Sequence, residues 1–284
     1  MTITPPSMPR LSIIIVTYNS TADVDACIGS LVQCPPSTDH EIVVIDNAST
    51  DGTAAAIRSR WHGIRVIESA ANVGFARANN VGIQQTLGSL ILLLNPDTSV
   101  PAGSLDALVA ALDSRPDAAV AGPRLVDAKG RVELSFGWML SPVAELRQKF
   151  LIKGSRRAGP VAAYVESITR KPREVDWVSG ACLLVRRTDA EAVGLMDERF
   201  FMYAEDVDFC ASIRARGRRV LFCPAAEIVH FRGRSRATAS AATERAYRRS
   251  QLAFYQKHRP RWLPWLRWYL KVRGRLPDNS TSDG

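Results

Sequence analysis

Short apolar runs alternate with amphipathic stretches up to about residue 115. The first run, Leu11–Thr17, has the composition of a buried strand. Such runs predict strands at 11–17, 41–46, 65–68 and 90–95. The stretches between and after them predict helices at 20–31, 51–61, 75–87 and 101–114. This alternation predicts an α/β fold with a mostly parallel sheet, flanking helices and right-handed crossovers.

The pattern changes after about Pro123. Shorter strands are expected at 131–135, 177–186, 220–223 and 227–231. Helices are expected at 188–193, 206–216 and 243–258, and the last of these is long and basic. Residues 141–172 are basic and interrupted by Gly and Pro, and they predict no clear element. The ends of the chain, 1–10 and 278–284, are expected to be disordered.

The composition is that of a globular protein, with 284 residues, 46% hydrophobic and 23% charged. The five cysteines form no CxxC pair, which favours free thiols in a reducing compartment. The chain contains no run of about 20 apolar residues, so no helix is expected to span a bilayer. The apolar run Ile13–Val16 is too short for a signal peptide. Any membrane attachment is therefore expected to be peripheral, in the cytoplasm on the inner membrane.

The net charge of +9 is concentrated late in the chain. A basic surface attracts nucleic acid, anionic lipid or diphosphates. We expect no nucleic-acid partner, because no aromatic-basic recognition module accompanies the charge. The segment Arg261–Lys271 interleaves Trp and Tyr with Arg and Lys, which suits a lipid headgroup layer. Packing of this segment on the rest of the protein is the alternative.

Polar residues end or follow the apolar strands, where ligands gather in an open α/β sheet. Thr17 ends the first strand, Asp46 ends the second, and Asp97 follows the fourth within Asn-Pro-Asp. A buried carboxylate needs a partner, and a divalent cation that carries a diphosphate is a suitable one. Structural roles stay open as alternatives. Asp46 can form an Asx turn with Ser49 and Asp51, and Asp97 can cap a helix.

The segment Asn72–Asn80 opens the third helix. Gly74 leaves backbone N–H groups at the helix N-terminus, which favours anions, and Arg77 is within reach of a phosphate. The segment matches neither the GxGxxG fingerprint nor a Walker A loop. A plain junction between loop and helix is the alternative.

Ser20 and Asp23 resemble a capping box at the start of the first helix.

Three carboxylates crowd into Glu205-Asp206-Val207-Asp208, directly after an aromatic segment. Like charges this close raise at least one pKa, which suits a general base. The alternative is a solvated acidic helix start, which the helix dipole stabilises. His230 lies in an apolar strand. A lone histidine there is either a core residue or a metal ligand.

Seven segments together resemble the inverting nucleotide-sugar glycosyltransferases of family 2, and most closely the bacterial rhamnosyltransferase-like branch. The resemblance covers about residues 11–232. It rests on SIIIVTYNS, VVIDNASTDGT, NVGFARANN, LLLNPDT, VSGACLLVRR, FFMYAEDVDFC and IVHFRG. It implies a GT-A fold, with a donor half at 11–123, an acceptor half at 124–240 and basic amphipathic helices at 241–277.

The resemblance also implies roles for individual residues. Asn95 stands where the family's metal motif has its first Asp, so Asp97 carries more of the metal binding, and Asp206 matches the catalytic base. The implied sites are Thr17, Asp46, Arg77, Asn79 and Asn95 for the nucleotide sugar, Asp97 and His230 for Mg²⁺ or Mn²⁺, Asp206 and Glu205 for catalysis, and Trp177, Gly180 and Asp208 on the acceptor side.

The implied reaction is a single displacement on a dTDP-, UDP- or GDP-sugar, with dTDP-rhamnose as the favoured donor. The implied acceptor is a glycan or a polyprenyl-diphosphate-linked saccharide at an anionic membrane. Two other functions stay open. A sugar nucleotidyltransferase usually carries a Gly-rich loop after its first strand, which Thr17-Tyr18-Asn19-Ser20 lacks. A membrane-bound scaffold would keep the fold without turnover.

Overall fold

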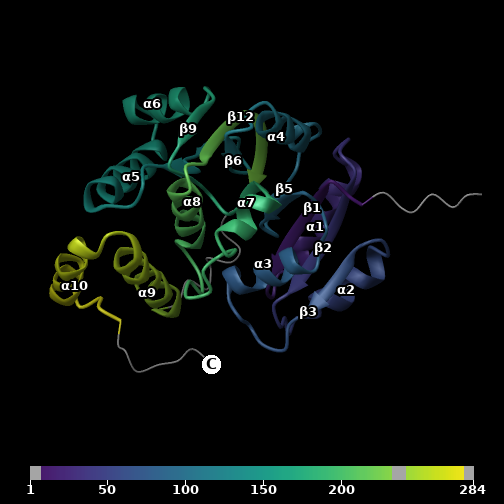
Figure 1. Ribbon diagram of the computed structural model, residues 1–284, viewed down its shortest axis with the longest axis horizontal. Coiled ribbons are helices and arrows are strands. Elements are labelled where there is room, and N and C mark those ends of the chain that lie inside the picture. The colour runs from purple at the N-terminus through teal and green to yellow at the C-terminus, as the bar shows by residue number, and fades with distance from the viewer. Residues whose placement is uncertain (1–7, 232–240, 278–284) are drawn as a thin grey trace, which may run out of the picture.

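The computed structural model describes residues 8–231 and 241–277. Four parallel strands form the first half of its central sheet, in the order β3-β2-β1-β4 (Figure 1). These strands are β1 (Leu11–Thr17), β2 (His40–Asp46), β3 (Arg65–Glu68) and β4 (Leu90–Leu94). The helices that connect them are α1 (Thr21–Gln33), α2 (Thr53–Arg60) and α3 (Phe75–Gln84).

The same sheet continues beyond β4 as β11-β6-β12-β5. β11 is antiparallel to both β4 and β6, whereas β6 and β12 are parallel to each other. These strands are β5 (Thr98–Ser99), β6 (Ala118–Val126), β11 (Cys182–Arg186) and β12 (Arg219–His230). β7 (Val132–Glu133) and β9 (Arg173–Val175) pair with β6 and β12, and β8 (Phe136–Gly137) pairs separately with β10 (Trp177–Val178). The prediction of a mostly parallel sheet is confirmed.

Helices cover both faces of the sheet, and β1 is buried along its whole length. Alternate residues of β1 contribute to two different cores. α1 and α4 (Ser104–Asp113) pack in the first core, and α3 and α8 (Glu205–Ala215) pack in the second. The apolar run of β1 follows from this arrangement, because a strand covered on both faces is apolar throughout.

A smaller third core joins the C-terminal helices to the rest of the protein. Phe254 and Tyr255 of α9 (Ala241–His258) pack with Phe200 and with Leu266 and Leu270 of α10 (Leu263–Val272). The short helix η1 (Pro260–Trp262) connects α9 to α10. Within the described residues, no helix is both long enough and apolar enough to cross a bilayer. All five cysteines are free thiols, as predicted.

Several predicted elements differ from the observed ones. Residues 141–172 form two helices, α5 (Pro142–Ser155) and α6 (Pro160–Ile168), each starting at a proline. Residues 177–186 form two strands with different partners, β10 and β11. The predicted strands at 220–223 and 227–231 are one strand, β12, with an irregularity after Cys223. α7 (Arg187–Ala192) starts one residue before its predicted position. The disorder predicted at 1–10 and 278–284 falls outside the described residues except at 8–10, where the Arg10 N–H donates to the Asp39 carbonyl.

Candidate active site

The carboxyl ends of β1, β2 and β4 form one edge of the sheet. The chain runs outward from β1 to β3 and returns to β4 on the other side of β1, so the strand order reverses between β1 and β4. Ligands of open α/β sheets bind at such a point. Thr17 pairs in register with Asp46 at this edge, and Asn95 directly follows β4. The structure therefore places three of the predicted donor-binding residues on the same edge.

Asp46 is buried, and Ser49 holds its carboxylate. The Ser49 hydroxyl donates to Oδ1 at 2.5 Å, and the Ser49 backbone N–H donates to Oδ2 at 3.1 Å. The Thr17 hydroxyl lies 2.8 Å from the Ser20 hydroxyl, and Ser20 makes no side-chain cap to α1. The expected turn at Asp46 is therefore present, whereas the expected cap by Ser20 is wrong. Contact of Thr17 and Asp46 with a nucleotide base stays a prediction.

The Asn-Pro-Asp turn after β4 connects three strands of the sheet. The Asn95 backbone N–H donates to the Ala181 carbonyl at 2.9 Å, just before β11. The Asp97 carbonyl accepts the Phe231 N–H at 2.8 Å, just after β12. Asp97 Oδ1 lies 3.2 Å from His230 Nε2. The two residues predicted to bind the metal are therefore adjacent in space, although they lie far apart in the sequence.

His230 is buried between two carboxylates. Its Nδ1 lies 3.0 Å from Glu133 Oε2, while its Nε2 faces Asp97. Burial lowers the pKa of His230, but the hydrogen bonds to Asp97 and Glu133 outweigh burial and leave the pKa raised. Sequence reasoning missed Glu133. Its only signal was a charged residue inside the short predicted strand at 131–135.

The donors at this position fit a divalent cation that takes its other ligands from phosphates and water. Asp97 offers a hard oxygen, and Glu133 fixes one ring nitrogen of His230 so that the other faces Asp97. Within the described residues, no group of three or more His, Cys, Asp or Glu side chains is placed to hold a metal. Mg²⁺ bound together with a phosphate substrate usually takes only one or two carboxylates from the protein.

The first turn of α8 carries the predicted catalytic residues. Asp206 Oδ2 accepts the Gly180 backbone N–H at 2.9 Å, and Oδ1 accepts the Val207 N–H at 2.8 Å. Gly180 precedes β11 and follows β10, so Asp206 is tied to the sheet edge that also holds Asn95. A Cβ atom at position 180 would lie 3.4 Å from the Asp206 Cβ. The structure thus brings Gly180 and Asp206 together.

Glu205 is buried beside Asp206. Its Oε2 has no hydrogen-bond partner, and burial followed by the charge of Asp206 raises the pKa of Glu205 well above its ordinary value. The two residues before it, Tyr203 and Ala204, have φ angles of 70° and 63°. Left-handed backbone at two successive non-glycine residues is costly and is concentrated at functional sites. The pKa of Glu205 is thus raised, as expected for this acidic cluster, but burial contributes more than the crowding of like charges.

The start of α3 contacts the loop before α8. The Phe75 N–H donates to the Phe201 carbonyl at 2.7 Å, so this helix-start donor is already engaged within the protein. Arg77 is exposed and lies 3.7 Å from Glu198. Asn79 is fully buried, and its Oδ1 has no hydrogen-bond partner. Arg77 is therefore open to a ligand. Asn79 is enclosed, and its contact with a donor stays a prediction.

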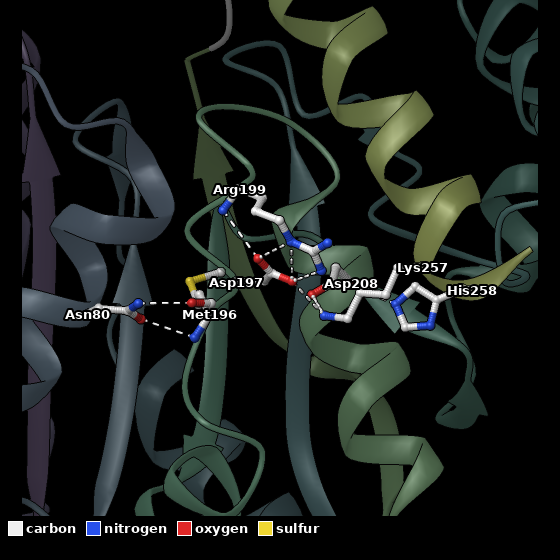
Figure 2. A network of polar contacts seen from close by, with 7 residues as sticks. All are labelled: Asn80, Met196, Asp197, Arg199, Asp208, Lys257 and His258. Carbon is white, nitrogen blue, oxygen red and sulfur yellow. Dashed lines mark hydrogen bonds and ion pairs between the residues drawn. The ribbon is translucent and has the colours of Figure 1, made fainter. Parts of the chain in front are cut away.

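The remaining acceptor-side candidates make contacts within the protein. Trp177 Nε1 donates to the Trp138 carbonyl at 2.9 Å. Asp208 is buried, and its carboxylate faces two residues of α9, with Lys257 Nζ at 2.8 Å and His258 Nε2 at 2.6 Å (Figure 2). These two contacts of Asp208 therefore hold α9 against α8. A direct contact of Trp177 or Asp208 with an acceptor stays a prediction.

Several known proteins are similar to this chain in sequence. The family model described as glycosyl transferase family 2 matches residues 12–171. The N-acetylglucosaminyl-diphospho-decaprenol L-rhamnosyltransferase of Mycobacterium tuberculosis is 32% identical over 284 residues, which is 92% of this chain and 89% of that protein. The low-salt glycan biosynthesis hexosyltransferase Agl10 of Haloferax volcanii is 28% identical over 227 residues, which is 78% of this chain and 66% of that protein.

Two solved structures share the fold. Mannosyltransferase PcManGT from Pyrobaculum calidifontis, in complex with GDP-Man and Mn²⁺, has a TM-score of 0.62 and 19% identity over 92% of this chain and 69% of its own. GalNAc-T7 with UDP, GalNAc and Mn²⁺ has a TM-score of 0.61 and 20% identity over 88% of this chain. The match spans half the length of GalNAc-T7. The predicted GT-A fold is confirmed.

Proposed function

The chain belongs to glycosyl transferase family 2 and is a glycosyltransferase, and from this premise we propose that it transfers rhamnose to a lipid-linked saccharide. The proposed donor is dTDP-rhamnose, and the proposed acceptor is a hydroxyl of a sugar on a polyprenyl diphosphate. The mycobacterial relative, whose name specifies both rhamnosyl transfer and such an acceptor, supports this choice because the similarity extends over most of both chains.

The observation that carries the proposal is a hydrogen-bonded path from the donor edge to the base. Asn95 after β4 bonds to Ala181, and Gly180 next to it bonds to Asp206. A carboxylate oxygen has two lone pairs, so Asp206 can accept these backbone bonds and still accept a proton. The path holds the base at a fixed place relative to the sheet edge, as general-base catalysis requires.

The reaction then follows from the position of Asp206. Asp206 takes the proton of the acceptor hydroxyl, and the acceptor oxygen forms a bond to the anomeric carbon of the donor sugar. The bond between that carbon and the diphosphate oxygen breaks, and its electron pair leaves with the diphosphate. Attack opposite the leaving group inverts the anomeric configuration in one step. No covalent enzyme nucleophile takes part.

Asp97 and His230 would hold the divalent cation, Mg²⁺ or Mn²⁺. When bound, the cation supplies positive charge that stabilises the departing diphosphate. Arg77 is exposed at the start of α3 and can add charge on the same side of the site. Asn95 provides a neutral side chain where an aspartate is expected, so within the Asn-Pro-Asp motif the negative charge rests on Asp97. Thr17 and Asp46 would contact the nucleotide base.

Glu205 would position the acceptor rather than take its proton. Burial favours its protonated form, which can donate a hydrogen bond to an acceptor oxygen. Residues 11–123 would form the donor half of the site, and 124–240 the acceptor half. Asp206 and His230 both follow β4 in the chain and belong to the second of these halves.

Donor binding and transfer are tested separately. A thermal-shift panel of dTDP-, UDP- and GDP-sugars, each with and without Mn²⁺ or Mg²⁺, identifies the donor, because a ligand that binds only the native state raises its stability. We expect dTDP-rhamnose to give the largest shift. A larger shift with another nucleotide sugar would replace the proposed donor.

Transfer to N-acetylglucosaminyl-diphospho-polyprenol is then followed by NMR of the new anomeric linkage. Asp206→Asn should bind donor normally and transfer at least about 100-fold more slowly. Asp113→Asn removes an exposed carboxylate at the end of α4 and should transfer at the normal rate. Normal turnover by Asp206→Asn, or a product that retains the donor's configuration, would overturn the proposed mechanism.

A further inference from the structure

Helix α5 exposes an apolar stripe. Val143, Leu146 and Phe150 are spaced by three and four residues, so they lie on one face of the helix. Each is between 63% and 72% exposed, whereas Ala144 and Leu151 are buried against the protein. The helix is therefore apolar on two sides. A helix on the surface of a soluble protein normally has a single apolar face.

Other exposed apolar side chains lie on neighbouring elements. Beside it, a groove of about 390 Å³ between α5 and α6 is lined by Phe150 and Tyr164, with Arg147 at its edge. Trp138 lies before α5 and stacks against Arg147 at 4.1 Å. The remaining members are on η1 and α10. They are Trp262, Trp265 and Trp268, all exposed.

These helices lie on the same side of the molecule, away from the donor strands β1–β3 (Figure 1). Met139 and Leu140, just before α5, pack in the same core as Leu266 and Leu270 of α10. Arg259 also donates to the Leu140 carbonyl at 3.4 Å. α10 therefore adjoins the start of α5, and we call α5, α6, η1 and α10 together the apolar face.

Cations are frequent on the elements of the apolar face, and unpaired acids are missing from these elements. From 141 to 168 the acidic residues are Glu145, which is buried, and Glu166, which pairs with Arg124 and Arg170; there is none from 259 to 277. The exposed cations are Lys149, Lys153, Arg156, Arg157, Arg259, Arg261, Arg267, Lys271, Arg273 and Arg275. Exposed aromatic and aliphatic side chains on elements rich in Lys and Arg match the boundary between lipid headgroups and acyl chains.

We propose that the apolar face binds the surface of an anionic bilayer, with α5 inserting Leu146 and Phe150 among the acyl chains. The charge selects lipid over a second copy of this chain, because two such basic faces would repel each other. The proposal does not depend on which sugar the enzyme transfers. It assigns a role to α5, which the sequence alone left without one.

Sedimentation of the full chain with vesicles tests the proposal. The vesicles are phosphatidylcholine alone, or phosphatidylcholine with about one quarter phosphatidylglycerol. We expect binding to the anionic vesicles and little to the neutral ones. The double variant Leu146→Asp, Phe150→Asp should bind at least about ten-fold more weakly, because both side chains lose their burial in lipid. Both residues are exposed, so the variant should fold normally.

Leu87→Asp is the matched control, since Leu87 is 66% exposed on the donor half of the protein. It should bind vesicles like the wild type. Lys153→Glu with Arg157→Glu should weaken binding to the anionic vesicles only. Equal binding by the wild type and the double variant would overturn the proposal, as would no binding by the wild type. So would a concentration-dependent dimer that the double variant abolishes. Donor thermal shifts should be unchanged in every variant, which separates this proposal from that of the transfer reaction.

Discussion

Glu205→Gln should change how the stability of this protein depends on pH. Glu205 is buried, its Oε2 has no hydrogen-bond partner, and the charge of Asp206 lies beside it. Burial, and after it the charge of Asp206, raises the pKa of Glu205 above its ordinary value of 4.5. Between 4.5 and the raised pKa, the folded protein therefore keeps a proton that the unfolded chain has released.

The size of the effect follows from this one proton. Folding takes up the proton in this pH window, so the free energy of unfolding falls as pH rises, by up to about 1.4 kcal/mol per pH unit from this group. The stability that Glu205 contributes in this way is fully present below pH 4.5 and is lost as pH rises through the pKa of Glu205 in the folded protein. Glutamine has nearly the same shape and does not titrate. The variant should therefore gain stability relative to the wild type as pH rises above 4.5.

Urea unfolding of both proteins at a series of pH values measures this difference. A constant offset between Glu and Gln cancels, because only the slope of the difference is used. Asp206→Asn is the control. It removes the negative charge beside Glu205, so the folded pKa of Glu205 should fall. That pKa should stay above 4.5, because burial is the larger cause of the raised pKa. A stability difference that does not change with pH above 4.5 would refute the account of Glu205.

Three further substitutions test other contacts. Gly74→Ala should lower the free energy of unfolding by about 3 kcal/mol, because φ is 84° and the new Cβ would lie 2.6 Å from the Phe201 carbonyl oxygen. Gly52→Ala has the same backbone strain but no neighbour within 4 Å, so urea unfolding should show a smaller loss of stability for it. Asp208→Asn should loosen α9 and cost about 2 kcal/mol, seen as faster proteolysis near α9. His230→Ala should abolish the Mn²⁺-dependent part of the donor thermal shift, and an unchanged metal dependence would remove His230 from the site.

The first half of the fold could be predicted because its central strands, β1 and β4, are buried on both faces. β1 and β4 consist almost wholly of apolar residues, so their limits are visible in the sequence. β6 was not predicted, because four of the first five residues, Ala118–Gly122, are Ala or Gly, which carry little strand signal. α5 was missed for a different reason. A helix that is apolar toward both the core and the outside shows no single polar face, and periodicity then gives no clear answer.

The residue types of the candidate site could be predicted, but their contacts could not. Asp206 stood out by its local crowding and Asp97 by its position after an apolar strand. Glu133 beside His230 was not foreseen, because the pairing depends on how β7 and β12 both join β6. The bond from Gly180 to Asp206 likewise depends on β11 pairing antiparallel with β4. Contacts between segments distant in the sequence are set by topology, which local patterns do not specify.

Helix α9 connects the apolar face to Asp206, the proposed base. Near its middle, α9 donates two hydrogen bonds to the buried Glu145 of α5, from Gln251 at 2.6 Å and Tyr255 at 2.7 Å. At its end, α9 holds Asp208 two residues after the base on α8 (Figure 2). An acceptor held by its lipid in the bilayer and a base held on α8 are then positioned by the same framework. Such positioning lowers the entropic cost of bringing the acceptor hydroxyl to the base.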